Sequence, residues 1–269
     1  MSIEKLKDEL KNFYYNLSPD PHQFEDIMDA YDKSHPESSV YQLKAMQYEV
    51  IAQNFKPVVF KNSPFYFEMG TKIAQCDGSP GFHHPGNWLL MRNEHMFKDN
   101  NPEDFEKFCE QIAQRFYLSC GPYVDLDHHC PSFTSVLENG LEGIYKQAED
   151  ALEQCISDEE TDFIKSAMRG LLAVKLLSER FADTAEQMID DAEDDTQRKF
   201  LKMIAHSARR SPWHKPETFY EGLNTLWFLR EVFGALEGIG TNSLGHPDRM
   251  LADLYKNDIE SGRLIKEEA

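Results

Sequence analysis

The sequence lacks the short motifs by which many enzymes are identified. It contains no Gly-x-Gly-x-x-Gly and no Gly-x₄-Gly-Lys-Ser/Thr string, so both common nucleotide-phosphate loops are missing. It also contains no Gly-x-Ser-x-Gly string, the simplest signal of a serine hydrolase. Spacing alone therefore points to no catalytic constellation.

Positive charge and long apolar runs are also scarce. The chain has 28 Lys plus Arg against 47 Asp plus Glu, a formal charge of −19. Such a surface repels phosphate backbones and anionic lipids, which argues against nucleic-acid and membrane partners. No apolar run approaches the roughly 20 residues that span a bilayer. The N-terminus, M-S-I-E-K-L-K-D-E-L, has no apolar signal-peptide core, so we expect a soluble, cytoplasmic chain.

Cysteine is too sparse and too irregularly spaced for a disulfide framework, with five residues in 269. One of them ends the string Asp127-His128-His129-Cys130, within Y-V-D-L-D-H-H-C-P-S-F. This string matches the signature of membrane acyltransferases, but those enzymes need transmembrane helices and further zinc-binding cysteines that are absent from this sequence. We interpret the match as accidental.

A zinc site in the same stretch is not expected either. Only Cys120, His128, His129 and Cys130 lie close together, and the gap between the first two fits no common zinc module. Loop histidines and an inert thiol are the simpler interpretation. The pair His83-His84, in a loop bounded by glycine and proline, is most simply solvent-facing.

Most of the chain carries apolar residues at helical spacing. Helices are predicted over residues 2–16, 21–33, 38–53, 102–117, 133–155, 158–188, 196–209 and 216–236. Ser157 and Glu160 have the spacing of a capping box before the longest of these. Residues 55–100 are instead predicted to be loop-rich with short strands, because Pro57–Phe60 and Pro64–Phe67 are β-prone. The predicted fold class is therefore mainly α.

Several strings in the C-terminal third carry a family resemblance. They are F-Y-E-G-L-N-T-L-W-F-L-R-E-V-F, N-S-L-G-H-P-D-R-M-L and A-D-L-Y-K-N-D-I-E-S-G-R-L-I-K-E-E-A. Upstream, V-L-E-N-G-L-E-G-I-Y-K-Q-A and the segment 181–188 continue the pattern, and E-K-L-K-D-E-L and S-S-V-Y-Q-L-K-A-M occupy the places of the opening helices. In order and spacing these strings resemble the pyruvate formate-lyase domain of glycyl radical enzymes.

The resemblance implies one partial pyruvate formate-lyase-like domain over residues 1–269. It would comprise N-terminal helices (1–54), a loop-rich segment (55–100) and a helical segment (101–269) that ends before the catalytic half of the family's α/β barrel. Family members use a backbone glycyl radical, installed by a radical S-adenosylmethionine activating enzyme, and a cysteine that becomes a thiyl. Their reactions range over carbon–carbon cleavage, dehydration and carbon–heteroatom cleavage.

Neither reactive loop of the family occurs in this chain. The Gly-Cys-x-Glu and Arg-Val-x-Gly-Tyr type strings are both missing, so no catalytic residue and no cofactor is predicted within it. The nearest cysteine string, Phe108-Cys109-Glu110, lies in a predicted amphipathic helix and is interpreted as packing.

The resemblance does imply some substrate-binding positions. His128 matches a histidine that faces the substrate in dehydrating relatives, and Thr241 and Asn242 fall in a loop that supplies small polar pocket residues. His246 stands where the family commonly has arginine, and imidazole replaces the planar guanidinium poorly.

Three hypotheses follow. The chain is an N-terminal fragment or split subunit of a glycyl radical lyase, whose partners are the missing half, the activating enzyme and a small-molecule substrate. Alternatively it is a non-catalytic helical binding module derived from that family. The third hypothesis is an independent enzyme centred on His128, His129 and Cys130.

Overall fold

The computed structural model describes residues 3–17, 24–66, 85–113, 131–237 and 243–266. Their helices are α1 (Ile3–Asn16), α2 (Glu25–Ser34), α3 (Val40–Asn54), the 3₁₀ turn η1 (Pro85–Asn87), α4 (Trp88–Asn100), α5 (Pro102–Ala113), α6 (Phe133–Leu152), α7 (Asp158–Met188), α8 (Asp195–Arg210), α9 (Phe219–Glu237), α10 (Pro247–Met250) and α11 (Ala252–Glu260). The described ranges contain no strand, and the predicted mainly helical class is confirmed.

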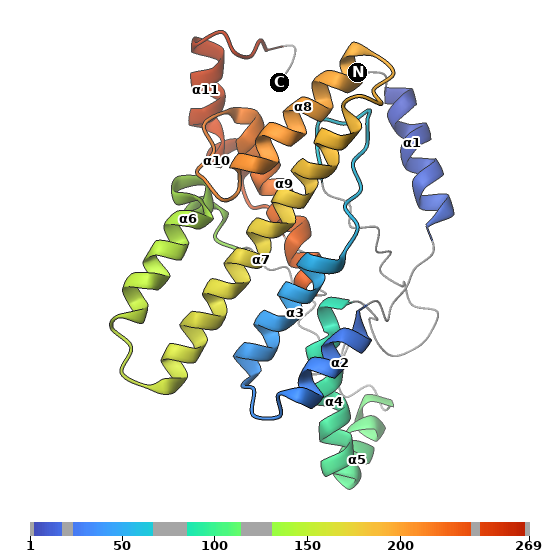
Figure 1. Cartoon of the computed structure of the whole chain (residues 1–269), viewed down its shortest axis with the longest axis vertical. Helices are drawn as coiled ribbons and strands as arrows, with labels where there is room; N and C mark the ends of the chain where they lie inside the picture. Colours follow the sequence, from blue (N-terminus) through green and yellow to red (C-terminus); the bar gives the residue numbers. More distant parts are fainter. Residues whose placement is uncertain (1–2, 18–23, 67–84, 114–130, 238–242, 267–269) are drawn as a thin grey trace.

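The long helix α7 organises the fold. It packs most extensively against α3 and α8, and then against α6. In Figure 1, α6 and α3 flank the lower half of α7, α8 runs beside its upper half, and α9 passes behind. The pair α4 and α5 extends from the lower end of the bundle (Figure 1). None of the helices within the described ranges combines the length and apolar character needed to cross a bilayer.

The start of α7 is fixed by the predicted capping box. The Ser157 hydroxyl accepts a hydrogen bond from Glu160 N at 3.1 Å, and the Glu160 carboxylate accepts one from Ser157 N at 3.2 Å. Two otherwise unpaired N–H groups are thereby satisfied. The acidic run before α8 has a similar role, since Asp194 accepts from Gln197 N at 2.9 Å.

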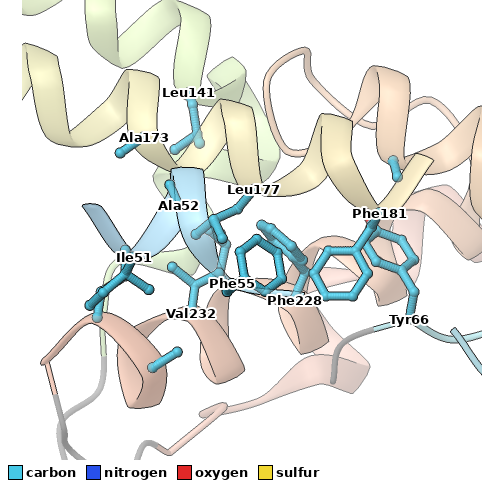
Figure 2. Close-up of a cluster of buried hydrophobic side chains, with 14 of the residues drawn as sticks. Ile51, Ala52, Phe55, Tyr66, Leu141, Ala173, Leu177, Phe181, Phe228 and Val232 are labelled. Carbon is cyan, nitrogen blue, oxygen red and sulfur yellow. The ribbon is translucent and has the colours of Figure 1, made fainter. Parts of the chain in front are cut away.

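The core lies where α3, α7 and α9 meet. Figure 2 shows Phe55, Phe181, Phe228 and Tyr66 gathered between these helices. Each is at most 1% exposed, and the ring centroids of Tyr66 lie 5.4 Å from Phe181 and 5.5 Å from Phe228. Edge-to-face and tilted contacts of this kind add to the stability gained by burying apolar area.

The helix predicted over 133–155 forms, but it is kinked at Gly140. This glycine has φ 67° and ψ 169°, a conformation available almost only to glycine. The kink lets Leu141 N and Glu142 N donate to Pro212 O and Trp213 O, both at 2.9 Å. The chain after α8 is therefore fixed against α6.

The segment predicted to be loop-rich differs from expectation. Helix α4 occupies residues 88–100, and Pro57–Phe60 is irregular backbone without a strand partner. Only Trp88 and Leu89 of α4 are buried, so the helix has no long apolar face that the sequence pattern could show. Contacts from other elements hold it instead: Trp88 Nε1 donates to Asp29 at 2.8 Å, and Arg92 forms a two-pronged pair with Asp32.

The two helix starts predicted at Pro21 and Pro216 are also displaced. Helix α2 begins at Glu25, after Phe24 in the left-handed conformation, and residues 18–23 lie outside the described ranges. Helix α9 begins at Phe219, where Asp258 of α11 accepts a hydrogen bond from Phe219 N at 2.9 Å.

Candidate functional site

A largely apolar cavity of about 380 Å³ lies between α3, α6, α7 and α9. Its wall is built from residues of these four helices and from two residues that precede α6. They are Tyr41, Lys44, Ala45, Tyr48, Pro131, Ser132, Phe133, Val136, Leu141, Ile144, Phe163, Ser166, Ala167, Gly170, Leu171, Val174, Leu229, Val232, Phe233, Leu236 and Glu237. Apolar cavities with a few polar groups at the edge are the usual form of ligand and partner sites.

The cavity exists because α3 and α6 both pack on α7 without packing extensively on each other. Phe133 and Phe233 bridge α6 and α9 with ring centroids 6.5 Å apart. On α7, Gly170 leaves room for the Tyr48 ring, since a Cβ there would lie 3.3 Å from that ring. Two rings of the wall remain open to solvent, with Phe163 49% and Phe233 37% exposed.

The polar edge of the cavity is an ion pair between α3 and α9. Lys44 Nζ lies 2.5 Å from the Glu237 carboxylate, with both side chains partly exposed. Lys44 thus places a positive charge at the C-terminal end of α9, where the helix dipole favours it. The two residues lie 193 positions apart in the chain, so no local pattern marks them as a pair.

The predicted substrate-binding residues His128, Thr241 and Asn242 lie outside the described residues. Their neighbours in the chain are described, however. Pro131, Ser132 and Glu237 all line the same cavity. The structure therefore brings together described residues that lie close in the chain to the three predicted ones, which it does not place.

The histidines and cysteines that the sequence analysis considered for a metal site are not placed by the structure. His83, His84, Cys120, His129 and Cys130 lie outside the described ranges. Among the described residues, no group of three or more His, Cys, Asp or Glu is arranged to hold a metal ion.

Two further residues named in the sequence analysis, Cys109 and His246, lie within the described ranges but outside the cavity wall. Cys109 is exposed on α5, so the interpretation of this thiol as core packing is wrong; an amphipathic helix also has an outer face, and Cys109 lies on it. His246 is exposed and precedes α10, and its backbone carbonyl accepts from Arg249 N and Met250 N, both at 3.1 Å.

Two phenols whose pKa is shifted strongly by burial, Tyr66 and Tyr220, lie away from the cavity. Burial raises the pKa of Tyr66 well above its ordinary value, and the Tyr66 hydroxyl donates to Ser211 O at 3.2 Å. Burial likewise raises the pKa of Tyr220, whose hydroxyl donates to Pro64 O. Both phenols are therefore neutral hydrogen-bond donors that tie the segment before residue 67 to α8 and α9.

The fold is similar to those of solved glycyl radical enzymes. A structure of the protein for 1,2-propanediol dehydration in Roseburia inulinivorans superposes with a TM-score of 0.76 at 19% identity, over 99% of this chain and 36% of that one. Hydroxyproline dehydratase from Clostridioides difficile gives a TM-score of 0.66 at 17% identity, over 100% of this chain and 38% of that one. At such identities the likeness establishes the fold.

Sequence relationships identify the family. Residues 93–269 match the pyruvate formate lyase-like family, and the chain belongs to it, with the domain type found in glycyl radical enzymes. A segment of 98 residues, 36% of this chain, is 32% identical to the trans-4-hydroxy-L-proline dehydratase of Clostridioides difficile and covers 12% of that protein. A segment of 140 residues, 49% of this chain, is 29% identical to the isethionate sulfite-lyase of Bilophila wadsworthia and covers 17% of it. This chain thus corresponds to well under half the length of its relatives.

The family's radical cannot be assigned to residues of this chain. The glycyl radical needs an Arg-Val-x-Gly-Tyr type loop, and its thiyl partner needs a Gly-Cys-x-Glu type loop; neither string occurs in the 269 residues.

Proposed function

We propose that this chain is the N-terminal helical part of a glycyl radical lyase and that it acts only together with a catalytic half that carries the cysteine and glycine loops. In that assembly it would contribute one wall of the substrate pocket. His128, Thr241 and Asn242 are the residues proposed to contact the small-molecule substrate.

The observation that carries this proposal is the coverage of the fold. The superposition uses 99% of this chain but only 36% of the solved relative. The part of the relatives that has no counterpart in this chain is the part in which the family resemblance places both reactive loops. A chain with this fold and without those loops has the framework of the enzyme and none of its radical chemistry.

The cavity supplies the surface that the catalytic half would cover. Its wall is apolar, and Phe163 and Phe233 stay open to solvent at its edge. Exposed aromatic rings around an apolar hollow are typical of surfaces that another chain or segment buries. The described residues nearest in the chain to His128, Thr241 and Asn242 include Pro131 and Glu237, which line this cavity and support a proposed pocket beside the proposed contact surface.

The experiment is an association measurement with a matched pair of variants. The partner is a chain from the same genome whose sequence carries both reactive loops, purified separately, and its affinity for this chain is measured by calorimetry under anaerobic conditions. Phe163→Asp puts a charge at the cavity edge and is expected to weaken binding about tenfold or more, which corresponds to about 1.4 kcal/mol.

Ile156→Asp is the control for that variant. Ile156 is 92% exposed, lies just before α7 and is not part of the cavity wall, so its replacement should leave the affinity unchanged. Equal weakening by both variants would exclude the cavity as the contact surface. If the genome encodes no such chain and the reading frame does not continue into these loops, the proposal fails and the helical binding module becomes the better account.

A further inference from the structure

One buried amide joins three separate segments next to the cavity. Gln47 is 0% exposed, and its Nε2 donates to Leu236 O and to Gly86 O, both at 2.9 Å. Its Oε1 accepts from Leu89 N at 3.0 Å. A single side chain on α3 thus holds the last turn of α9, the 3₁₀ turn η1 and the first turn of α4.

All three contacts are with backbone groups, and two of these groups, Leu236 O and Leu89 N, lie at the ends of α-helices. The C=O groups in the last turn of a helix and the N–H groups in its first turn have no partner within the helix and must find one elsewhere. Gln47 satisfies the carbonyl of Leu236 and the N–H of Leu89 at once. Both amide hydrogens of Gln47 are used, so its burial is fully compensated.

The position of Gln47 in α3 makes this glutamine unexpected on packing grounds. It lies four residues after Leu43 and four before Ile51, on the face of α3 that carries Met46 and Val50. All four of these neighbours are at most 8% exposed. A leucine or methionine would fill this position without the need for three hydrogen-bond partners, so volume alone does not account for an amide.

A second contact from the same helix acts on the same end of α9. Lys44, three residues before Gln47, pairs with the carboxylate of Glu237, the last residue of α9. Residues 44 and 47 of α3 therefore contact two consecutive residues of α9. Gln47 binds the carbonyl of Leu236, and Lys44 pairs with the side chain of Glu237. Leu236 and Glu237 both line the cavity.

We infer that Gln47, assisted by Lys44, is a positioning residue: it fixes the cavity-lining end of α9, Leu236 and Glu237, relative to the start of α4. The inference rests on the proposed function, because it gives this edge of the cavity a role in the assembled enzyme. Gln47 touches no substrate itself and acts through the end of α9.

The test is residue-resolved amide hydrogen exchange on the whole chain. Gln47→Leu removes all three hydrogen bonds, and it should speed exchange at Leu89 and in the last turn of α9 by about tenfold or more relative to the rest of the core. Gln47→Glu keeps an acceptor for Leu89 N but has no amide hydrogens, so the last turn of α9 should exchange faster while Leu89 stays protected. Lys44→Met should affect only the end of α9.

The control is Ile51→Ala, one turn further along α3 and 1% exposed. This substitution weakens the core without touching the three backbone groups. In the variant, amide hydrogens should therefore exchange faster throughout the core. If Gln47→Leu gives that same uniform pattern, Gln47 is merely a structural residue and the inference is overturned. Gln47→Glu and Lys44→Met remain informative if Gln47→Leu does not fold.

A kinetic arm separates this inference from the proposed function. In the enzyme assembled with its catalytic half, Lys44→Met and Gln47→Glu should raise KM about tenfold with a smaller change in kcat, because positioning of the bound substrate is lost. An assembly without activity would contradict the proposed function and leave the exchange result intact. A fall in kcat alone, with local exchange unchanged, would contradict the positioning role.

Discussion

Gly140 shows how a single residue shapes this molecule. A Cβ at this position would lie 2.5 Å from Trp213 O and 2.7 Å from Lys215 N, both backbone atoms, and the backbone conformation is itself one that other residues avoid. We expect Gly140→Ala to lower the free energy of unfolding by about 3 kcal/mol or more, because conformational strain and a backbone clash combine. Urea unfolding followed by circular dichroism measures this change.

Gly262→Ala is the matched control for that substitution. Gly262 also has a positive φ, 71°, but a Cβ there would meet nothing within 4 Å. Its replacement should lower the free energy of unfolding by about 1 kcal/mol, because only the strain of a side chain at positive φ is added. Similar losses for the two variants would mean that the contact of α6 with residues 213–215 contributes nothing.

The buried tyrosines predict an alkaline loss of stability. Burial raises the pKa of Tyr66 and Tyr220 in the folded chain, so the unfolded chain releases these protons first. Their contribution is complete below the unfolded pKa of about 10 and falls above it, by about 1.4 kcal/mol per pH unit for each tyrosine. Urea unfolding between pH 9 and pH 11 tests this slope.

Replacing one tyrosine identifies its share of the slope. Tyr66→Phe should reduce the alkaline slope by one proton, although loss of the bond to Ser211 O also costs about 1 kcal/mol at neutral pH. An unaltered slope in Tyr66→Phe would show that this phenol ionises in the folded state.

Among the elements, α1 is attached by polar contacts and by half-buried apolar side chains such as Leu6 and Leu10, which line a groove shared with Leu223 of α9. None of its described residues is buried. The Glu9 carboxylate accepts from Lys61 N at 2.8 Å, from Asn62 N at 3.0 Å and from the Asn62 side chain at 2.9 Å. Phe13 adds one ring contact, with its centroid 5.4 Å from that of Phe60.

This attachment predicts local release rather than global unfolding. Glu9→Ala leaves two backbone N–H groups without their partner and should make α1 the first site of cleavage in limited proteolysis, with the melting temperature lowered by only a few degrees. Glu4→Ala, at a side chain that is 79% exposed, should not change the cleavage pattern. Cleavage that begins elsewhere in the Glu9 variant would contradict the prediction.

Local sequence signals predicted those elements that depend on local interactions. The capping box at Ser157 and the long apolar stripe of α7 are contained within one helix, so the sequence located both. Helix α4 was not predicted, because Asp29, Asp32 and Gln47 on other helices hold it. Gln47 itself left a detectable signal, a polar residue in the apolar stripe of α3, which could have marked it as a buried contact.

The candidate site was only partly predictable for the same reason. The family resemblance selected His128, Thr241 and Asn242, which stay predictions because they lie outside the described residues. It could not reveal that the Lys44–Glu237 pair and the amide of Gln47 meet the end of α9, because these contacts join residues more than 180 positions apart. Such pairings depend on how α3 and α9 pack, which no local pattern records.

At the scale of the whole molecule, a well-packed core and an open apolar cavity occur together. The aromatic cluster around Phe181 is closed by residues of this chain, whereas the cavity wall leaves Phe163 and Phe233 exposed. The fold matches 36–38% of the length of the solved relatives. An apolar cavity left partly open is the feature that the proposed assembly would cover.

The central claim is tested most directly by electron paramagnetic resonance of the radical. This chain and the chain that carries both reactive loops are each incubated anaerobically with the activating enzyme, S-adenosylmethionine and a reductant, alone and together. We expect no glycyl radical signal from this chain alone, because it lacks the loop, and a signal with substrate turnover only when both chains are present. A radical on this chain alone, or full turnover by the other chain without it, would contradict the account.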